Sequence, residues 1–257
     1  MTQTIAVLNQ KGGVGKTTTA ISLAAYLSKQ GYSVLVVDLD PQSNTTTGLG
    51  LFKASNQPGV YEVLLKNARL EDALKEVSSK FYILPTDEQL AAIEIELVGQ
   101  SEREFALKYA LSQASHYDYV FIDCPPALGL LTINALTAAD SLLIPVQAEY
   151  YALQGLGQLL QVVQMVRQGL NPELELLGIV ITMYDSRTTL SQQVKQEVEK
   201  YFGDKVFKVV IPRNIRLAEA PSYGKHIVDY DKWSKGARAY KKLAKEIDHR
   251  VNGKIKT

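Results

Sequence analysis

The sequence predicts one α/β domain built on a doubly wound, mainly parallel β-sheet with helices on both faces. Short apolar, β-branched runs recur along the chain, and most of them lack polar alternation, as expected of strands that are buried on both faces. Segments with apolar residues at helical spacing lie between these runs, and alternation of strands and helices is typical of doubly wound folds. The 257 residues fit one large domain.

The residue pattern of each segment predicts one strand or one helix. The apolar, β-branched runs predict strands at residues 5–9, 34–38, 81–84, 119–123, 141–146, 178–182 and 206–211. Helical spacing of apolar residues, such as Ala20, Leu23, Ala24 and Leu27, predicts helices at residues 17–30, 101–114, 153–167, 191–202 and 235–251. We assign residues 1–257 to one domain, in which the polar end, residues 252–257, is expected to be a disordered tail.

The composition is that of a globular protein without disulfide bonds. Apolar residues make up 46% of the chain and charged residues 21%, which is ordinary for this class. Cys124 is the single cysteine, so no internal disulfide can form. The first residues lack the basic and apolar regions of a signal peptide, and no apolar run approaches the roughly 18 residues that cross a bilayer. We therefore expect a cytoplasmic protein without stable membrane association.

The net charge of +1 is distributed unevenly along the chain. Residues 187–257 hold 17 Lys and Arg against 8 Asp and Glu, a charge of +9, whereas residues 1–186 hold 11 against 19, a charge of −8. A basic final third on an acidic body favours a polyanionic partner. Lysine-rich helix surfaces that only confer solubility explain the same counts, so the charge alone does not decide between the two interpretations.

The strongest motif is KGGVGKTT at residues 11–18. It follows a predicted strand and precedes a predicted helix, which is the context that a phosphate-binding P-loop requires. Glycines let the backbone wrap closely around an anion, and the positive end of the helix adds to the attraction. In this motif Lys16 is expected to reach the β- and γ-phosphates, and the Thr17 hydroxyl is expected to ligate Mg²⁺.

Lys11 adds a second lysine near the start of the loop. Within one site a second lysine is redundant, but it becomes useful if it crosses to the phosphates of a partner subunit, as an arginine finger does. Contact with the ligand of its own subunit, or capping of the loop, is the alternative. The residues by themselves leave the two open.

Three aspartates follow predicted strands. Asp38 and Asp123 each end an apolar run, so they are expected at the carboxyl edge of the sheet, where open α/β folds bind ligands. A carboxylate beside Mg²⁺ is expected to stay ionised. Asp40 precedes Pro41, and this pair is also typical of a turn.

These segments together resemble the ParA/Soj family of DNA-partition ATPases. Residues 11–18 are similar to its deviant Walker A box, residues 37–42 to its switch I, and residues 119–126 to its Walker B strand and switch II. Residues 211–225 resemble the C-terminal block of the chromosomal proteins, so the resemblance covers nearly the whole chain. It implies a P-loop fold of the SIMIBI class and slow, partner-stimulated hydrolysis of ATP to ADP and phosphate.

The resemblance implies a role for each matching residue. Lys11 contacts nucleotide across the dimer, and Gly12 lies at that interface. Asp40 orients or activates the attacking water, Asp38 supports the metal shell or the switch, and Asp123 holds Mg²⁺ through water. The residues that bind phosphate and Mg²⁺ are Gly13, Val14, Gly15, Lys16, Thr17 and Thr18, and those that hold adenine are Pro212 and Asn214, with Thr182 or Met183.

The resemblance also implies partners. It predicts an ATP-dependent homodimer that binds double-stranded DNA without sequence preference, associates with the nucleoid, and is released when a ParB-type centromere-binding protein stimulates hydrolysis. Arg187 and Arg216 match positions of DNA-binding arginines, and phosphate contacts of this kind give affinity without base reading. For four further lysines we favour a solvated helix surface: Lys195, Lys200, Lys225 and Lys235.

Other functional classes fit less well. A membrane-positioning ATPase like MinD needs a C-terminal amphipathic helix, but only Val251 and Ile255 are strongly apolar in residues 248–257; liposome flotation tests this alternative. An iron–sulfur redox relative needs two cysteines in each subunit, and this chain has one. A tyrosine-kinase relative would carry a tyrosine cluster at its tail. A cargo-positioning ATPase for a load other than DNA remains an alternative, because a separate adaptor protein recognises the cargo in such systems.

The chain departs from the family pattern at three positions. Ser43 and Thr45 stand where Gly and Ala are usual after switch I, and His226 stands where Pro is usual. We expect none of the three to touch the chemistry.

Overall fold

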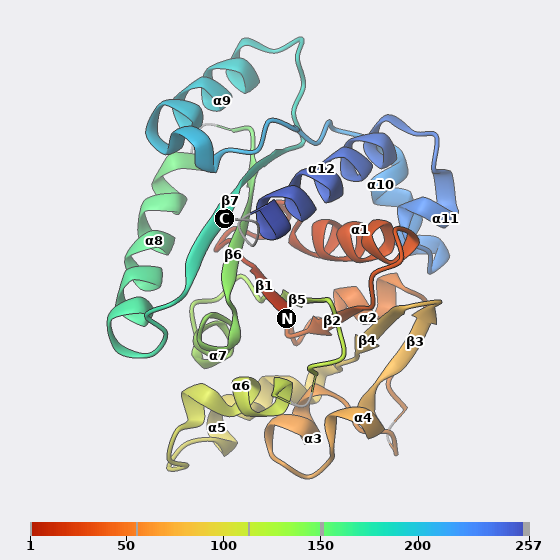
Figure 1. Cartoon of the computed structure of the whole chain (residues 1–257), viewed down its shortest axis with the longest axis vertical. Coiled ribbons are helices and arrows are strands. Elements are labelled where there is room, and N and C mark those ends of the chain that lie inside the picture. The colour runs from red at the N-terminus through yellow and green to blue at the C-terminus, as the bar shows by residue number, and fades with distance from the viewer. Residues whose placement is uncertain (1, 55, 113, 150–151, 254–257) are drawn as a thin grey trace.

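The computed structural model shows a central sheet with helices packed on both faces (Figure 1). It describes residues 2–54, 56–112, 114–149 and 152–253. The predicted fold class, a doubly wound and mainly parallel sheet, is confirmed.

The sheet has seven strands in the order β3-β4-β2-β5-β1-β6-β7. All neighbouring strands are parallel except β3 and β4, which are antiparallel at one edge. The inner strands are almost fully buried, in agreement with their apolar composition. The strands are β1 (Gln3–Val7), β2 (Val34–Asp38), β3 (Lys75–Ser78), β4 (Phe81–Leu84), β5 (Tyr119–Asp123), β6 (Ser141–Gln147) and β7 (Glu175–Thr182).

Two apolar clusters form the core, one on each face of the sheet. Helices α1 and α12 pack together over one face, and α6, α7, α8 and α9 contribute to the cluster on the other. The helices are α1 (Lys16–Lys29), α2 (Asn44–Gly48), α3 (Val60–Leu64), α4 (Leu70–Ala73), α5 (Ile93–Glu96), α6 (Ala106–Leu111), α7 (Leu130–Ala138), α8 (Ala152–Gly169), α9 (Thr189–Phe202), α10 (Ile215–Glu219), α11 (Ile227–Asp231) and α12 (Lys235–Asn252). Short 3₁₀ turns are η1 (Glu88–Ala92), η2 (Arg103–Phe105), η3 (Gly203–Lys205) and η4 (Ala220–Tyr223).

The predicted strand at residues 206–211 is wrong. The segment runs beside β7, whose carbonyls accept two of its N–H groups, at 2.9 and 2.8 Å. Between those two bonds, the Glu246 carboxylate of α12 accepts the N–H groups of Lys208 and Val209 at 2.9 and 3.2 Å. A side chain thus takes the donors that a β-ladder would use, so this segment, all of which the structure describes, forms one isolated bridge, between Val206 and Ile179, instead of a strand.

Several elements differ from the sequence prediction in extent. The predicted helix at residues 101–114 is shorter, because η2 precedes α6. Neither β3, a polar strand at the sheet edge, nor α7, which follows the Asp123 loop, was predicted. The last helix includes Asn252, whose side-chain amide donates to Asp248 at 2.6 Å, and residues 254–257 of the predicted tail lie outside the described residues.

None of the helices that the structure describes has both the length and the apolar character that a membrane-spanning segment requires.

Candidate functional site

The phosphate loop joins β1 to α1. Gly13 and Gly15 have φ angles of +74° and +91°, in the left-handed region that glycine enters without strain. The helix begins at Lys16, and the N–H of Thr19 donates to the Gly15 carbonyl at 2.9 Å. The loop therefore delivers the chain to the N-terminus of a 14-residue helix, where unpaired N–H groups and the helix dipole favour an anion.

The Lys16 ammonium lies within this loop. Its side chain is buried, and Nζ donates to the Lys11 carbonyl at 3.2 Å. Burial lowers the pKa of the ammonium, while the charges of Asp123 and Asp40 oppose that shift. An ammonium has three N–H groups, so two remain for other acceptors such as phosphate oxygens.

Lys11 is held by its own chain. Its half-exposed ammonium forms an ion pair with Glu149, which follows β6. The buried Asn9 side chain fixes the backbone beneath it, because Nδ2 donates to the Pro145 carbonyl at 2.8 Å and Oδ1 accepts the Lys11 N–H at 3.0 Å. Sequence analysis missed Glu149, because the end of β6 is far from the phosphate loop along the chain, and it gave Asn9 no role although this residue lies just before the loop.

Asp38 and Asp123 lie side by side at the carboxyl edge of the sheet. They are register partners of β2 and β5, and both are fully buried. Burial raises the pKa of Asp38 to about 8 and that of Asp123 to about 6, and the charge of Asp123 adds to the shift of Asp38. In each carboxylate Oδ1 is buried without a hydrogen-bond partner in the described part of the chain.

These two carboxylate oxygens fit a nearby divalent cation. The Thr17 hydroxyl, the predicted metal ligand, donates to Asp123 Oδ2 at 2.7 Å, so the structure brings Thr17, Asp38 and Asp123 together. Within the described residues no group of three or more His, Cys, Asp or Glu side chains could hold a metal ion. Mg²⁺ commonly takes only one or two carboxylates and completes its shell with phosphate oxygens and water, so the arrangement suits a nucleotide-bound Mg²⁺.

The segment after β2 returns to the same carboxylates. Asp38 Oδ2 accepts the Thr46 N–H at 2.8 Å and the Thr46 hydroxyl at 2.6 Å. Asp40 is buried, and its Oδ1 accepts the Gln42 N–H at 3.0 Å. The turn that the Asp40–Pro41 pair predicts is therefore present, and the same carboxylate lies near enough to Lys16 for the two charges to interact.

Thr45, which we expected to lie apart from the chemistry, contacts a predicted Mg²⁺-site residue. The buried Thr45 hydroxyl donates to Asp123 Oδ2 at 2.7 Å, the same oxygen that Thr17 contacts. Both hydroxyls stabilise the charged form of Asp123 and lower its pKa against the effect of burial. No sequence signal marks this contact, because it depends on how α2 packs against the end of β5.

Thr45→Ala is expected to weaken Mg²⁺-dependent ATP binding by about 10-fold, because a hydrogen bond to a charged group contributes roughly 1.5–3 kcal/mol. Titration of Mg²⁺ against a fluorescent ATP analogue measures the effect. Thr47→Ala is the matched control, since the exposed Thr47 hydroxyl donates only to the Ser43 carbonyl, at 2.8 Å, among the contacts that the structure describes. An unchanged Mg²⁺ dependence in Thr45→Ala would contradict the role.

A cavity of about 440 Å³ opens beside the phosphate loop. Its volume lies within the roughly 300–1,000 Å³ that is usual for small-molecule sites. Tyr240 of α12 closes part of it, and the Thr182 hydroxyl donates to the Val14 carbonyl at 2.8 Å, which joins the end of β7 to the loop. The cavity gathers the residues predicted near adenine with part of the phosphate loop: Met183, Pro212 and Asn214 with Val14, Gly15 and Thr18.

Comparison with known proteins agrees with this geometry. A protein family described as an AAA domain matches residues 2–176. The chain is 54% identical over 249 residues to the sporulation initiation inhibitor protein Soj of Bacillus subtilis, an alignment that covers 96% of this chain and 98% of that protein. It is 50% identical over 245 residues to the chromosome partitioning protein ParA of Myxococcus xanthus, covering 95% and 87%. The chain belongs to the ParA/Soj family of chromosome-partitioning ATPases.

A solved structure extends the comparison to ligands. A Mycobacterium smegmatis protein described as cobyrinic acid a,c-diamide synthase is 41% identical and superposes with a TM-score of 0.86, covering 98% of this chain and 96% of that one. That protein has been solved with ADP and magnesium and with an ATP analogue and magnesium.

The two arginines that family resemblance assigns to DNA are exposed but paired. Arg187 is 87% exposed and makes two side-chain hydrogen bonds to Asp185, at 2.9 and 2.7 Å. Arg216 is half-exposed, pairs with Glu219 at 2.9 Å and lies 3.6 Å from Asp231. A DNA phosphate that contacts either arginine must therefore compete with a carboxylate of the same chain.

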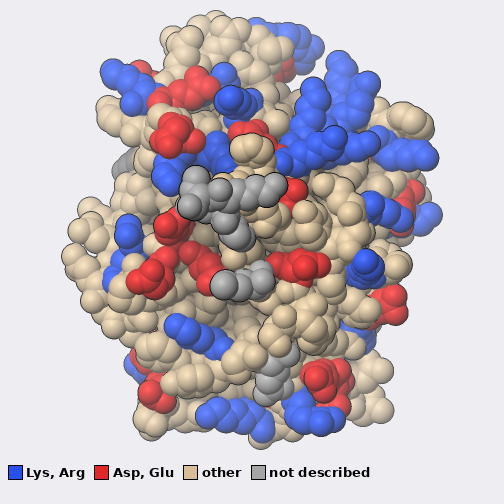
Figure 2. All heavy atoms as spheres, in the orientation of Figure 1, with Lys and Arg blue, Asp and Glu red and all other residues tan. Residues whose placement is uncertain are grey.

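A second basic surface lies on α12; sequence analysis considered only its Lys235, and favoured a solvated role for that lysine. Figure 2 shows Lys and Arg side chains gathered at the upper right, where Figure 1 places α12 and α10. The opposite side of α12 is buried against the core, so these side chains share one exposed face at helical spacing. None of them forms an ion pair with another described residue. We name this set the α12 basic stripe: Lys235, Arg238, Lys241, Lys242 and Lys245.

The spacing of the α12 basic stripe was a usable signal. The cations recur at helical spacing and alternate with apolar residues such as Tyr240, Leu243 and Ile247, which are buried. This amphipathic pattern is visible in the sequence. On α9, by contrast, Lys195 pairs with Glu199 at 2.9 Å, which agrees with the solvated surface favoured for that lysine.

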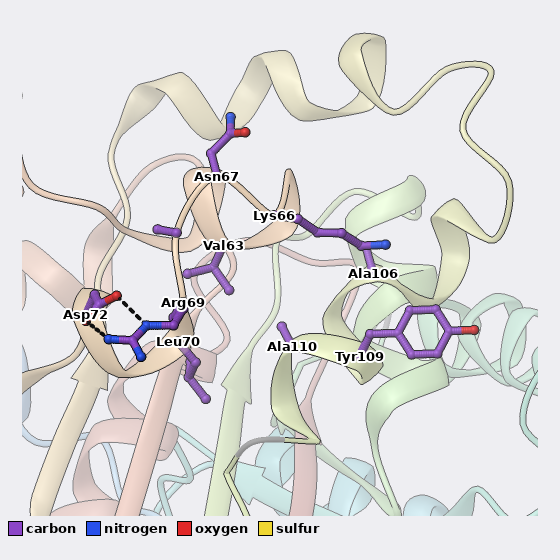
Figure 3. A pocket seen from close by; sticks show the side chains of 10 residues that line it. Val63, Lys66, Asn67, Arg69, Leu70, Asp72, Ala106, Tyr109 and Ala110 are labelled. Atoms are coloured by element: carbon purple, nitrogen blue, oxygen red, sulfur yellow. Dashed lines mark hydrogen bonds and ion pairs between the residues drawn. The ribbon is translucent and has the colours of Figure 1, made fainter.

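A separate hollow of about 480 Å³ lies between the α3–α4 turn and α6 (Figure 3). Arg69 at its edge makes two 2.9 Å hydrogen bonds to Asp72, and the Lys66 ammonium lies over the Tyr109 ring, 5.9 Å from its centroid. None of the predicted site residues lines this hollow, so it is not part of the phosphate or adenine site.

Proposed function

We propose that this partitioning ATPase binds ATP·Mg²⁺, dimerises, binds DNA as a dimer and leaves it after stimulated hydrolysis. The observation that carries the proposal is the meeting of four features at one edge of the sheet: the phosphate loop, the cavity of about 440 Å³ beside it, the buried carboxylate pair and the second lysine. Nucleotides and magnesium in the M. smegmatis relative support the same ligands here.

The roles follow from position and charge. The phosphate loop, residues 12–18, surrounds the phosphates, and Met183, Pro212 and Asn214 hold adenine. Thr17, Asp38 and Asp123 would hold Mg²⁺, which would supply positive charge against the phosphates. Asp40 orients the attacking water. Because phosphoryl transfer depends mainly on positioning and charge stabilisation, withholding one contact is enough to keep turnover slow.

Lys11 supplies the contact that is withheld. In the single subunit its ammonium is occupied by Glu149. When two subunits close face to face, Lys11 exchanges this carboxylate for the partner's more highly charged triphosphate. The exchange makes dimerisation depend on the γ-phosphate, since a ligand shifts an equilibrium only through its different affinity for the two states.

DNA binding uses the α12 basic stripe together with Arg187 and Arg216. The α12 basic stripe makes the initial contact with DNA, because its cations do not have to break an ion pair before they bind a phosphate. A dimer doubles these contacts, so DNA affinity follows the ATP state. A ParB-type partner then stimulates hydrolysis, and the separated subunits leave the nucleoid.

Lys11→Ala tests the switch. The variant is expected to bind ATP within a few-fold of the wild type, because Lys16 and the loop amides remain, yet to stay monomeric and off DNA with ATP. Sedimentation velocity and DNA retention, each with ADP and with ATP, measure both properties.

Lys108→Ala, a change of another exposed lysine, is the control and should behave as the wild type. The wild type is expected as a monomer with ADP and a DNA-bound dimer with ATP. ATP-dependent dimerisation of Lys11→Ala, or DNA binding by wild-type monomers without ATP, would contradict the proposal that Lys11 couples ATP binding to dimerisation and DNA binding.

A further inference from the structure

A short helix beside the switch II loop exposes apolar side chains. Ile95 of α5 is 76% exposed, and Val98, just after the helix, is 65% exposed. Their neighbours Ile93 and Leu97 are buried, so α5 packs through one side and presents the other to solvent. Large apolar side chains exposed next to each other mark interaction surfaces more often than isolated ones do.

Acidic residues flank these two side chains along the chain. Between residues 86 and 104 the chain has six acidic residues and one basic residue. Asp87 is paired with Lys53 and Glu104 with Arg103. The others are exposed and form no ion pair with a described residue. We name these four, with Ile95 and Val98, the α5 surface: Glu88, Glu94, Glu96 and Glu102.

Glu94 connects the α5 surface to the nucleotide site. Its Oε1 accepts the N–H of Leu130 at 2.8 Å, at the N-terminus of α7. A Cβ atom on Gly129 would lie 2.2 Å from the same oxygen, so a larger residue there would push the Glu94 carboxylate away from this position. Six residues of chain separate Asp123 from Leu130, and the first three of them, residues 124–126, belong to the segment that resembles switch II.

The α5 surface lies far from the proposed DNA-binding face. In Figure 1, α5 is at the lower left, whereas α12 and α10 are at the upper right. A macromolecule on α5 therefore does not have to displace DNA from the α12 basic stripe. Its charge is also opposite, which excludes DNA as the occupant and favours a cationic one.

We propose that the α5 surface binds a basic segment with apolar side chains from the protein that stimulates hydrolysis. Apolar side chains of the segment cover Ile95 and Val98, and its cations meet the flanking carboxylates. The segment draws Glu94 away from Leu130, which frees the α7 N-terminus and lets the switch II loop move at the nucleotide. The inference rests on the proposed function, since it locates the partner contact of that cycle.

The test separates docking from its consequence. Ile95→Ser/Val98→Ser removes the apolar contact, and Glu94→Ala removes the link to α7. Met165→Ser is the matched control, because Met165 is also exposed, at 62%, but lies on α8. Each protein, with ATP and duplex DNA, is titrated with the purified ParB-type protein of the same organism; anisotropy reports binding, and phosphate release reports turnover.

The double variant is expected to bind the ParB-type protein about 10-fold more weakly and to lose stimulation, with basal turnover and ATP-dependent dimerisation unchanged. Glu94→Ala is expected to bind within about 3-fold of the wild type, because only one of several rim carboxylates is removed, yet to lose most of the stimulation. Met165→Ser is expected to match the wild type.

Wild-type binding and stimulation in the double variant would overturn the inference while leaving the proposed function intact. Loss of ATP-dependent dimerisation in that variant would also overturn it, since the face would then meet a second copy of this chain. If the ParB-type protein does not stimulate the wild type, the partner step of the proposed function fails, and the inference fails with it.

Discussion

Asp40→Ala is expected to lower ATP hydrolysis by about 100-fold or more, because a positioned carboxylate contributes roughly 10²–10⁴-fold to proton transfer. ATP affinity is expected to stay within a few-fold of the wild type, since the phosphate loop, Thr17 and the Asp38–Asp123 pair are untouched. A dimer that cannot hydrolyse ATP keeps its DNA contacts, so the variant is expected to remain on DNA with ATP. The ParB-type partner is not expected to stimulate its hydrolysis or release it from DNA.

Asp40→Asn separates the two interpretations of this residue. An asparagine side-chain oxygen keeps the hydrogen bond from Gln42 that holds the turn, which is 3.0 Å long in the structure, but it cannot take a proton. Single-turnover hydrolysis of both variants is the measurement, with Asp204→Ala, a change of an exposed aspartate on η3, as control. Wild-type turnover of Asp40→Asn would exclude a role for Asp40 as the proton acceptor.

The second large effect is expected on DNA. Arg238→Glu/Lys241→Glu/Lys245→Glu reverses three charges on the α12 basic stripe and is expected to lower DNA affinity roughly 100-fold or more near physiological salt. The alanine version is expected to reduce the slope of log affinity against log salt by about 0.9 for each DNA phosphate that the protein no longer neutralises. ATP binding and ATP-dependent dimerisation should be unchanged, because these side chains point away from the core.

Single substitutions of Arg187 and Arg216 test how much these two arginines contribute to DNA binding, for comparison with the α12 basic stripe. Arg187→Glu and Arg216→Glu are each expected to abolish DNA retention with ATP binding intact, since a reversed charge repels phosphate next to a carboxylate that is already present. Lys195→Glu on α9 is the control, because Lys195 is paired with Glu199. Filter binding over a salt series is the measurement. Unchanged DNA binding in both arginine variants would reject that surface, and an unchanged triple variant would reject the stripe.

The parallel sheet could be predicted because its strands are buried on both faces. A strand such as β2 needs apolar, β-branched residues throughout, and that local pattern identifies it with its bounds, Val34–Asp38. Segment 206–211 has the same composition, but the Glu246 carboxylate of α12, about 40 residues later, takes two of its donors. Strand pairing depends on which acceptor is nearest in space, and local composition does not contain that information.

The sequence by itself determined the chemistry that one contiguous segment carries: the phosphate loop, its glycines with positive φ, its lysine and the helix that follows. It also placed Asp38 and Asp123 at strand ends, because parallel strands direct their carboxyl ends to one edge. Tertiary structure alone decided which side chains meet those groups. The Thr45 hydroxyl donates to Asp123, and Glu149 forms an ion pair with Lys11. Glu94 accepts the first N–H of α7. Carboxylates pair with both Arg187 and Arg216, whereas the α12 basic stripe has no ion-pair partner among the described residues. Hydrogen bonds and ion pairs act over a few ångströms in space, so partners distant in sequence become known only when the chain has folded.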